Sequence, residues 1–212
     1  MIKGVVFDFD GTLVDSMKII FEALNKALSD RNLQTVGLDL LGRMAGRPLS
    51  DIVKSKMQIP DLTIEGIEKD VFKAYVGFCS KSCRLLPNVE STLRALKAMQ
   101  VKLGLFTTTP RKPLKVAVRR LGIENYFDIM LAKDDAKCKP NPDGLEQIIA
   151  EFGIKKDECL YVGDSPIDVL TGKAAGVRTI AVTTGVATME QLKENAPDNI
   201  ITDLEQLLML IN

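Results

Sequence analysis

Short runs of consecutive apolar residues recur along the chain, and each run stops abruptly at a polar group. The clearest runs lie at positions 5–7, 103–106 and 160–162, and weaker ones lie at 129–131 and 179–182. Apolar runs of this length, without alternating polar residues, are typical of strands that are buried on both faces of a parallel sheet. The pattern therefore predicts a parallel β-sheet in the interior of the protein.

The intervals between these runs carry the spacing of amphipathic helices from about residue 87 onward. Apolar residues recur at i, i+3, i+4 and i+7 from Leu114 and again from Leu145. Gly122, Gly153 and Gly176 stand where such helices would end. Alternating strands and helices predict a doubly wound, Rossmann-like α/β core built on a parallel sheet.

Residues 16 to about 82 break this alternation. Their apolar positions follow helical spacing in two stripes, and no strand-like run lies between the stripes. The simplest interpretation is an all-helical domain inserted after the first strand. We therefore expect a core domain of residues 1–14 and 83–212 and an inserted helical domain of residues 15–82.

Composition narrows the classes of protein to which the chain can belong. Its 28 Lys and Arg residues balance 28 Asp and Glu residues, whereas nucleic-acid-binding proteins carry a basic excess. No stretch of about 18 apolar residues is present, so we expect no membrane span. Acidic residues arrive too early for a signal peptide, and the 4 cysteines form no CxxC pair, which favours free thiols in a reducing cytosol. We expect a cytoplasmic monomer or homodimer that binds neither nucleic acid nor membranes.

Polar side chains follow each of the three clearest strands. They are Asp8, Asp10, Thr107, Thr108, Asp164 and Asp168. Ligands bind beyond the carboxyl ends of the strands in an open α/β sheet, so these side chains should converge on one site. The chain has no His, which leaves carboxylates, Lys, hydroxyls or a hard metal ion to do any chemistry. Because two carboxylates about 4 Å apart repel each other by roughly 4 kcal/mol, a divalent cation would stabilise the cluster, and oxygen ligands select Mg²⁺.

Four short segments occur in order: DFDGTLVDS at residues 8–16, FTT at 106–108, KP at 139–140 and GDSPID at 163–168. Their order and spacing resemble the four motifs of the haloacid dehalogenase superfamily over essentially the whole chain. The helical insertion lies where the phosphoglycolate phosphatase-like branch of that superfamily carries its cap domain. The resemblance implies a Mg²⁺-dependent phosphatase that hydrolyses a small phosphorylated metabolite through an aspartyl-phosphate intermediate, with a phosphoglycolate-like substrate favoured.

The resemblance also implies roles for the acidic residues. Asp8 would be the nucleophile that forms the aspartyl-phosphate. Asp10 would protonate the leaving oxygen and then activate the hydrolytic water. Mg²⁺ would be held by the Asp8 carboxylate, the main-chain carbonyl of Asp10 and Asp164.

The remaining motif residues have both a functional and a simpler interpretation. Thr107 and the amide of Thr108 would donate hydrogen bonds to the phosphoryl oxygens, although Thr107 could instead cap a helix. Lys139 would supply positive charge to the phosphate and the nucleophile, or be a solvated loop charge. Asp168 falls three residues after Ser165, where a capping-box acid belongs, so it lies behind the metal's direct ligands or only caps the helix.

Two observations separate the branches of the superfamily. An acid two residues after the nucleophile favours hydrolysis of phosphate esters or anhydrides over dehalogenation or phosphonate hydrolysis. The absence of His from the first cap helix disfavours a phosphomutase. Inorganic pyrophosphatase and sugar-phosphate or nucleotide phosphatase remain alternatives. Outside the class, a receiver-like phospho-Asp protein has no use for a helical insertion, and a non-catalytic binding protein would have no need of Asp8, Asp10 and Lys139.

The segment GRMAGRP at residues 42–48 interrupts the helical pattern of the insertion. A loop of this kind could face the active site and offer a guanidinium to a second anionic group of the substrate. Arg47, between Gly46 and Pro48, is the candidate for this specificity role. The alternative is a surface turn between two helices.

Overall fold

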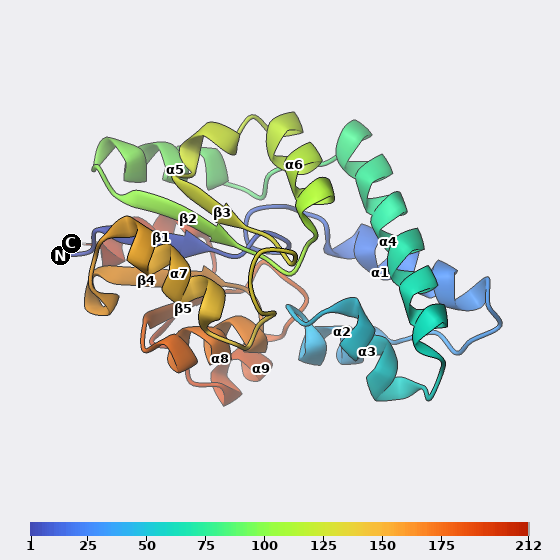
Figure 1. Ribbon diagram of the computed structural model, residues 1–212. Coiled ribbons are helices and arrows are strands. Elements are labelled where there is room, and N and C mark those ends of the chain that lie inside the picture. Colours follow the sequence, from blue (N-terminus) through green and yellow to red (C-terminus); the bar gives the residue numbers. More distant parts are fainter. Residues whose placement is uncertain (212) are drawn as a thin grey trace.

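The computed structural model describes residues 1–211, apart from the side chains of residues 43, 44 and 56. Its α-helices are α1 (Met17–Ser29), α2 (Leu38–Met44), α3 (Leu49–Lys56), α4 (Asp61–Lys81), α5 (Val89–Ala98), α6 (Arg111–Arg120), α7 (Asp143–Phe152), α8 (Pro166–Ala175) and α9 (Met189–Glu194). Its strands are β1 (Gly4–Phe7), β2 (Lys102–Phe106), β3 (Ile129–Leu131), β4 (Cys159–Gly163), β5 (Arg178–Val182) and β6 (Asn199–Ile201). Short 3₁₀ helices are η1 (Glu124–Tyr126), η2 (Lys156–Glu158) and η3 (Leu204–Leu210). Figure 1 shows a central sheet between helices, with α1 to α4 grouped at one end.

All strands of the described chain form one parallel sheet in the order β3-β2-β1-β4-β5-β6. The chain builds outward from β1 through β2 to β3 and then crosses to β4 on the other side of β1. The strand order therefore reverses between β1 and β4, where open α/β sheets bind their ligands. The predicted doubly wound core is confirmed. The sequence pattern missed β6, because residues 199–201 contain no apolar run longer than two residues.

Helices cover both faces of the sheet. Val5 and Phe7 of β1 belong to one apolar cluster with α5 and α6, whereas Val6 belongs to another with α7. Alternate side chains of a strand point to opposite faces, so every residue of β1 meets a helix layer and is buried. This two-sided burial explains why the strands are continuous apolar runs.

Helices α1 to α4 cover residues 17–81 without an intervening strand. Their apolar faces pack into a cluster of their own, with Leu24, Leu28 and Ile67 fully buried in it. Helix α4 extends beyond that cluster, since Tyr75 near its end packs with residues of the sheet. The predicted helical insertion is confirmed, whereas the boundaries at 14/15 and 82/83 stay a prediction.

The two connections between the insertion and the core run side by side. Val14 forms an antiparallel bridge with Leu85. The backbone N–H of Asp15 donates to the carbonyl of Arg84 at 3.1 Å, and the N–H of Leu86 donates to the carbonyl of Leu13 at 3.0 Å. These hydrogen bonds hold both ends of the insertion at one point next to β1.

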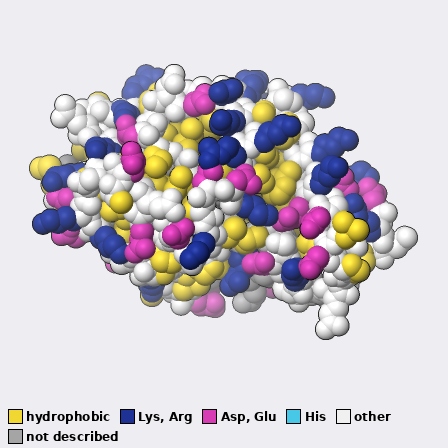
Figure 2. Space-filling view, viewed as in Figure 1, with side chains coloured by type: hydrophobic (Ala, Val, Ile, Leu, Met, Phe, Trp, Pro, Cys, Tyr) yellow, Lys and Arg dark blue, Asp and Glu magenta, His cyan; other side chains and the backbone are white. Residues whose placement is uncertain are grey.

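The remaining expectations concern the surface and the thiols. No helix in the described part of the chain has the length and apolar character needed to cross a bilayer. The cysteines at 79, 83, 138 and 159 are free. Acidic and basic side chains are interspersed over the face shown in Figure 2, in keeping with the balanced charge of the sequence.

Candidate active site

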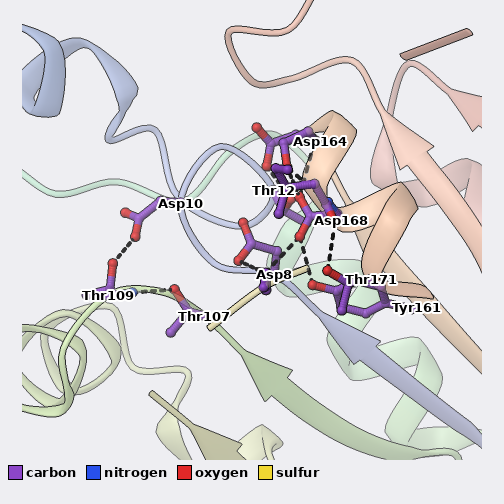
Figure 3. A network of polar contacts seen from close by, with 12 residues as sticks. Asp8, Asp10, Thr12, Thr107, Thr109, Tyr161, Asp164, Asp168 and Thr171 are labelled. Carbon is purple, nitrogen blue, oxygen red and sulfur yellow. Dashed lines mark hydrogen bonds and ion pairs between the residues drawn. The ribbon is translucent and has the colours of Figure 1, made fainter. Parts of the chain in front are cut away.

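Three carboxylates meet at the carboxyl ends of β1 and β4. Asp8 directly follows β1, Asp164 directly follows β4, and Asp168 lies in the first turn of α8. The backbone N–H of Asp8 donates to the carbonyl of Val162 at 2.8 Å, which fixes the end of β1 against β4. One oxygen from each carboxylate lies within 4.8 Å of the others. Figure 3 shows the three side chains gathered at this place. The group is buried and suited to a divalent cation.

Lys139 reaches the same group from the loop before α7. Its Nζ donates to Asp8 Oδ1 at 2.6 Å and to Asp168 Oδ1 at 2.7 Å. The ammonium lies between the rings of Phe106 and Tyr161, 5.3 and 5.4 Å from their centroids. Lys139 is only 2% exposed, so the alternative of a solvated loop charge is wrong.

Asp168 is held by more hydrogen bonds than the other two carboxylates. Its Oδ1 accepts from Lys139 and from the Tyr161 hydroxyl at 2.7 Å, and its Oδ2 accepts from the backbone N–H and hydroxyl of Ser165. The bonds to Ser165 form the predicted capping box of α8. A carboxylate has about four acceptor positions, and these four donors occupy that number. Asp168 lies close enough to the other two carboxylates to share an ion with them, and it is also a direct partner of Lys139.

Asp8 and Asp164 keep acceptor positions free. Asp8 accepts a side-chain hydrogen bond only from Lys139, on Oδ1, within the described residues. Asp164 Oδ1 accepts from the Thr12 hydroxyl at 2.7 Å. The Oδ2 atoms of both residues have no donor among the residues described, and both residues line a cavity between the core and the insertion. Asp8 Oδ2 thus has no protein donor among these residues, whereas Asp164 Oδ2, which also accepts none, lies against Gly11 and Gly185.

The electrostatics of the group favour a bound cation. Burial, together with the charges of Asp168 and Asp10, raises the pKa of Asp8 to about 7 in spite of the opposing Lys139 ammonium. Burial, and then the charges of Asp8 and Asp168, raise the pKa of Asp164 well above its ordinary value. Burial lowers the pKa of Lys139, but Asp168 and Asp8 outweigh that effect and raise it, so the ammonium keeps its charge. The single positive charge of Lys139 therefore does not balance the three carboxylates of the site.

The Asp10 side chain does not join this group. Its Oδ1 accepts from the hydroxyls of Ser16 at 2.6 Å and Tyr75 at 2.7 Å, and its Oδ2 accepts from Thr109 at 2.5 Å. The Asp10 carboxylate therefore lies outside the group of three, although it belongs to the same site. Asp10 points toward Thr109 in Figure 3 and lines the same cavity as Asp8.

Thr107 and Thr108 follow β2 and line that cavity as expected. The Thr107 hydroxyl accepts from the N–H of Thr109 at 3.1 Å. Pro110, not Thr107, stands at the N-cap of α6, so the helix-cap alternative is wrong. The sequence interpretation missed Thr109, although it directly follows the FTT motif.

Two glycines permit the close packing around Asp164. A Cβ at Gly11, which has φ of +87°, would lie 2.5 Å from Asp164 Oδ2, and a Cβ at Gly185 would overlap the same atom. The Thr184 hydroxyl donates to the carbonyl of Gly11 at 2.7 Å, which joins the two segments. The loop that contains Gly185 carried no signal in the sequence interpretation.

Arg47 lies in the turn between α2 and α3 and lines the cavity from the side of the insertion. Helix α2 includes residues 42–44, so the turn is shorter than expected, and the side chains of residues 43 and 44 lie outside the described part. Gly46 packs so closely on α8 that a Cβ there would lie 2.5 Å from Ser165 Oγ. The turn is thus pressed against the core, not free on the surface. Arg47 is partly buried and has no hydrogen bond or ion pair among the residues described.

The cavity has two different walls. The core contributes polar groups, and the insertion contributes a mostly apolar surface. The members from the insertion are Met17, Ile20, Leu41, Ala45, Gly46, Arg47, Leu49, Ile52, Val71, Phe72 and Tyr75. Among these described residues Arg47 is the one cation.

Comparison with known proteins agrees with the architecture. The chain is 30% identical to the phosphoglycolate phosphatase of Photorhabdus laumondii, over 99% of this chain and 92% of that protein. It is 28% identical to the pyrophosphatase PpaX of Halalkalibacterium halodurans, over 99% and 97%. The crystal structure of a predicted phosphoglycolate phosphatase from Haemophilus somnus superposes with a TM-score of 0.86 at 27% identity, over 100% of this chain and 98% of that one. Residues 5–182 match the sequence profile of the haloacid dehalogenase-like hydrolases. The family indicated by the four motifs is confirmed, and the chain belongs to the haloacid dehalogenase-like hydrolase family.

Proposed function

We propose that this protein is a Mg²⁺-dependent phosphatase that hydrolyses a small phosphorylated metabolite through an aspartyl-phosphate, with a phosphoglycolate-like substrate favoured. The observation that carries the proposal is the position of Asp8: it lines the cavity, contacts Lys139 at 2.6 Å and shares a buried carboxylate group with Asp164. Relatives named phosphoglycolate phosphatase and pyrophosphatase support the same class of reaction.

The residues present fit a magnesium ion. The free oxygens of Asp8 and Asp164, together with the main-chain carbonyl of Asp10, would hold it. Oxygen ligands from two carboxylates are the usual protein contribution to such a site. When bound, Mg²⁺ supplies positive charge that offsets the repulsion between the carboxylates and the incoming phosphate.

The reaction has two displacements at phosphorus. An Asp8 oxygen bonds to phosphorus as the bond to the leaving oxygen breaks, and Asp10 gives that oxygen its proton. Water then bonds to phosphorus, Asp10 takes the proton from the water, and the bond between Asp8 and phosphorus breaks. Phosphate leaves, and both carboxyl groups return to their starting states.

The other residues of the site orient the reacting groups and neutralise their charge. Thr107 and the amide of Thr108 donate hydrogen bonds to the phosphoryl oxygens, and Lys139 orients Asp8 and favours its ionised form against the effect of burial. Asp168 in turn fixes Lys139. Such fixed donors and charges accelerate phosphoryl transfer without moving during the reaction.

We infer that residues 15–82 act as a cap over this site and that the protein works in the cytoplasm as a monomer or homodimer. The mostly apolar wall of the cavity, which comes from this segment, supports the first inference. The free thiols and the lack of a membrane-spanning helix in the described chain support the second.

A phosphatase screen tests the proposed function directly. The purified protein with Mg²⁺ is expected to hydrolyse p-nitrophenyl phosphate, and its efficiency should be highest on one small phosphorylated metabolite of a broad panel. Asp8→Asn protein, prepared in parallel, serves as the blank for contaminating phosphatases. A receiver-like or non-catalytic protein would release no more phosphate than the blank.

Magnesium is expected to stabilise the protein more at about pH 8 than at about pH 5.5. Between about pH 4 and pH 7 the folded, metal-free protein holds a proton on Asp8 that the unfolded chain has lost, because the pKa of Asp8 is raised to about 7. Without metal, stability therefore falls as the pH rises through this window. The metal needs ionised ligands and offsets that loss at high pH, by about 2.7 kcal/mol when its concentration is 100 times Kd. Thermal unfolding with and without millimolar MgCl₂ measures both trends.

Two variants serve as controls for the metal experiment. Asp164→Asn should remove most of the Mg²⁺-induced shift in Tm, because it replaces a carboxylate that has a free oxygen. Asp168→Asn should lower Tm without metal yet keep most of the shift, since four donors already occupy the acceptor positions of Asp168. Equal losses of the shift in the two variants would contradict this division of roles.

Arg47→Ala is expected to lower kcat/KM about ten- to hundredfold on a substrate with a second anionic group. Arg47 lines the cavity and its guanidinium has no partner among the described residues, so it is available to a carboxylate or second phosphate. Hydrolysis of p-nitrophenyl phosphate, which lacks that group, should change little. Arg94→Ala, which removes an exposed side chain of α5 outside the cavity, is the control. Parallel losses on both substrates would place the specificity elsewhere.

Pyrophosphate is the second candidate substrate, and the same cation supports it. Both phosphoglycolate and pyrophosphate carry a second anion next to the scissile phosphate. The metabolite panel separates the two.

A further inference from the structure

Tyr75 reaches into the active site from the helical insertion. It lies near the end of α4, is 1% exposed, and belongs to the same buried apolar cluster as Phe9 and Leu13. Its hydroxyl donates to Asp10 Oδ1 at 2.7 Å, across 65 positions of sequence. This contact joins the insertion to the proposed acid–base residue.

Packing alone does not explain why residue 75 is a tyrosine with a buried hydroxyl. Phe would fill the same space without burying a polar group, and an unpaired buried hydroxyl costs free energy. Tyr75 avoids that cost only because Asp10 accepts its hydrogen. Burial, and then the charge of Asp10, raise the pKa of Tyr75, so the hydroxyl remains a donor.

Hydroxyl groups alone hold the Asp10 carboxylate. Ser16 and Tyr75 donate to Oδ1, and Thr109 donates to Oδ2; no cation among the described residues bonds to either oxygen. Ser16 precedes α1 and Thr109 follows β2, so Tyr75 is the donor that α4 supplies. Two donors occupy Oδ1 and one occupies Oδ2, which makes Oδ2 the oxygen better placed to carry the transferable proton.

We propose that Tyr75 is a positioning residue for the acid–base step: its hydroxyl fixes the Asp10 carboxyl so that Oδ2 presents the proton to the leaving oxygen. This inference rests on the proposed phosphatase function. Because α4 carries Tyr75, proton transfer depends on how α4 packs against the core. Proximity alone would not supply this orientation, and a misplacement of about 1 Å costs roughly a hundredfold in rate.

The leaving group provides the test, because a poor leaving group needs the proton and a good one does not. We compare kcat/KM of the wild-type protein and Tyr75→Phe on the preferred alkyl phosphate and on p-nitrophenyl phosphate. We expect a loss of about ten- to hundredfold on the alkyl ester and less than about threefold on the aryl ester. Because kcat/KM reports only steps up to the first irreversible one, the later hydrolysis of the aspartyl-phosphate does not obscure the difference. The ratio of the two losses is also independent of how much of the variant is folded.

Two further variants sharpen the result. Tyr126→Phe makes the same chemical change outside the cavity and should alter neither substrate. Asp10→Asn should show the leaving-group dependence more strongly, and adding Tyr75→Phe to it should not increase that dependence, because both changes remove the same function.

Equal losses on both substrates, or no loss on either, would overturn the positioning role while leaving the proposed function intact. Wild-type protein that hydrolyses neither ester would overturn both. Further leaving-group dependence on adding Tyr75→Phe to Asp10→Asn would show that Tyr75 does not act through Asp10.

Discussion

Asp8→Asn is expected to lower turnover roughly a thousandfold or more while the protein stays folded. An amide oxygen is too poor a nucleophile to form the covalent intermediate, and Asn has nearly the shape of Asp. The change also removes a buried carboxyl group, whose pKa burial raises to about 7. Lys139 keeps its second partner, Asp168, at 2.7 Å, so no unpaired charge remains. We therefore expect activity and stability to separate in this variant.

Steady-state rates and thermal unfolding of the purified variant measure the two effects. Mass spectrometry must show that residue 8 has not deamidated, since restored Asp would imitate residual activity. Asp15→Asn is the matched control: it makes the same change on an exposed residue of the same segment that does not line the cavity. Retention of more than about a tenth of wild-type turnover by the verified Asp8→Asn protein would refute the covalent mechanism.

Lys139→Met is expected to destabilise the fold by about 3–5 kcal/mol and to abolish activity. The substitution leaves Asp8 and Asp168 buried without the ammonium that contacts both at 2.6 and 2.7 Å. Met has a similar length and fits between the rings of Phe106 and Tyr161, so a cavity does not explain the loss. Urea unfolding in the absence of metal gives the change in free energy.

A double variant distinguishes charge from packing. Lys139→Met combined with Asp168→Asn removes one cation and one anion from the buried group, so it should recover much of the lost stability. It should not recover activity, because nothing then positions or neutralises the nucleophile. A single Lys139→Met variant as stable as wild type would show that the buried ion pairs contribute nothing to the fold.

Much of the architecture was predictable because it follows from local patterns. Strands buried on both faces must be continuous apolar runs, so β1, β2 and β4 were recognisable without any knowledge of their neighbours. Parallel strands end at the same edge of a sheet, which was enough to predict that Asp8 and Asp164 would meet. The capping box of α8 requires only that Asp168 follow Ser165 by three residues, so it was equally predictable. The short strand β6 escaped, because its sequence differs little from a loop.

The contacts that give each polar group its task join segments far apart in the chain. Lys139 contacts Asp8 across 131 positions, and Thr12 contacts Asp164 across 152. Neither pairing has a periodicity or a spacing rule that a single sequence displays. Whether Lys139 is a solvated charge or a buried one depends on how the loop before α7 packs on the sheet.

The sequence by itself determined the parallel sheet, the helical insertion and the edge of the sheet where the acidic residues lie, because hydrophobic burial and strand direction act through local pattern. Only the tertiary structure decided the surroundings of each carboxylate. Asp168 accepts four hydrogen bonds, Asp8 and Asp164 accept one side-chain hydrogen bond each among the described residues, and Asp10 is turned toward the hydroxyls of Ser16, Tyr75 and Thr109. The physical reason is that the environment of a buried carboxylate is made by whichever side chains the packing of distant helices and loops brings within about 3 Å of it.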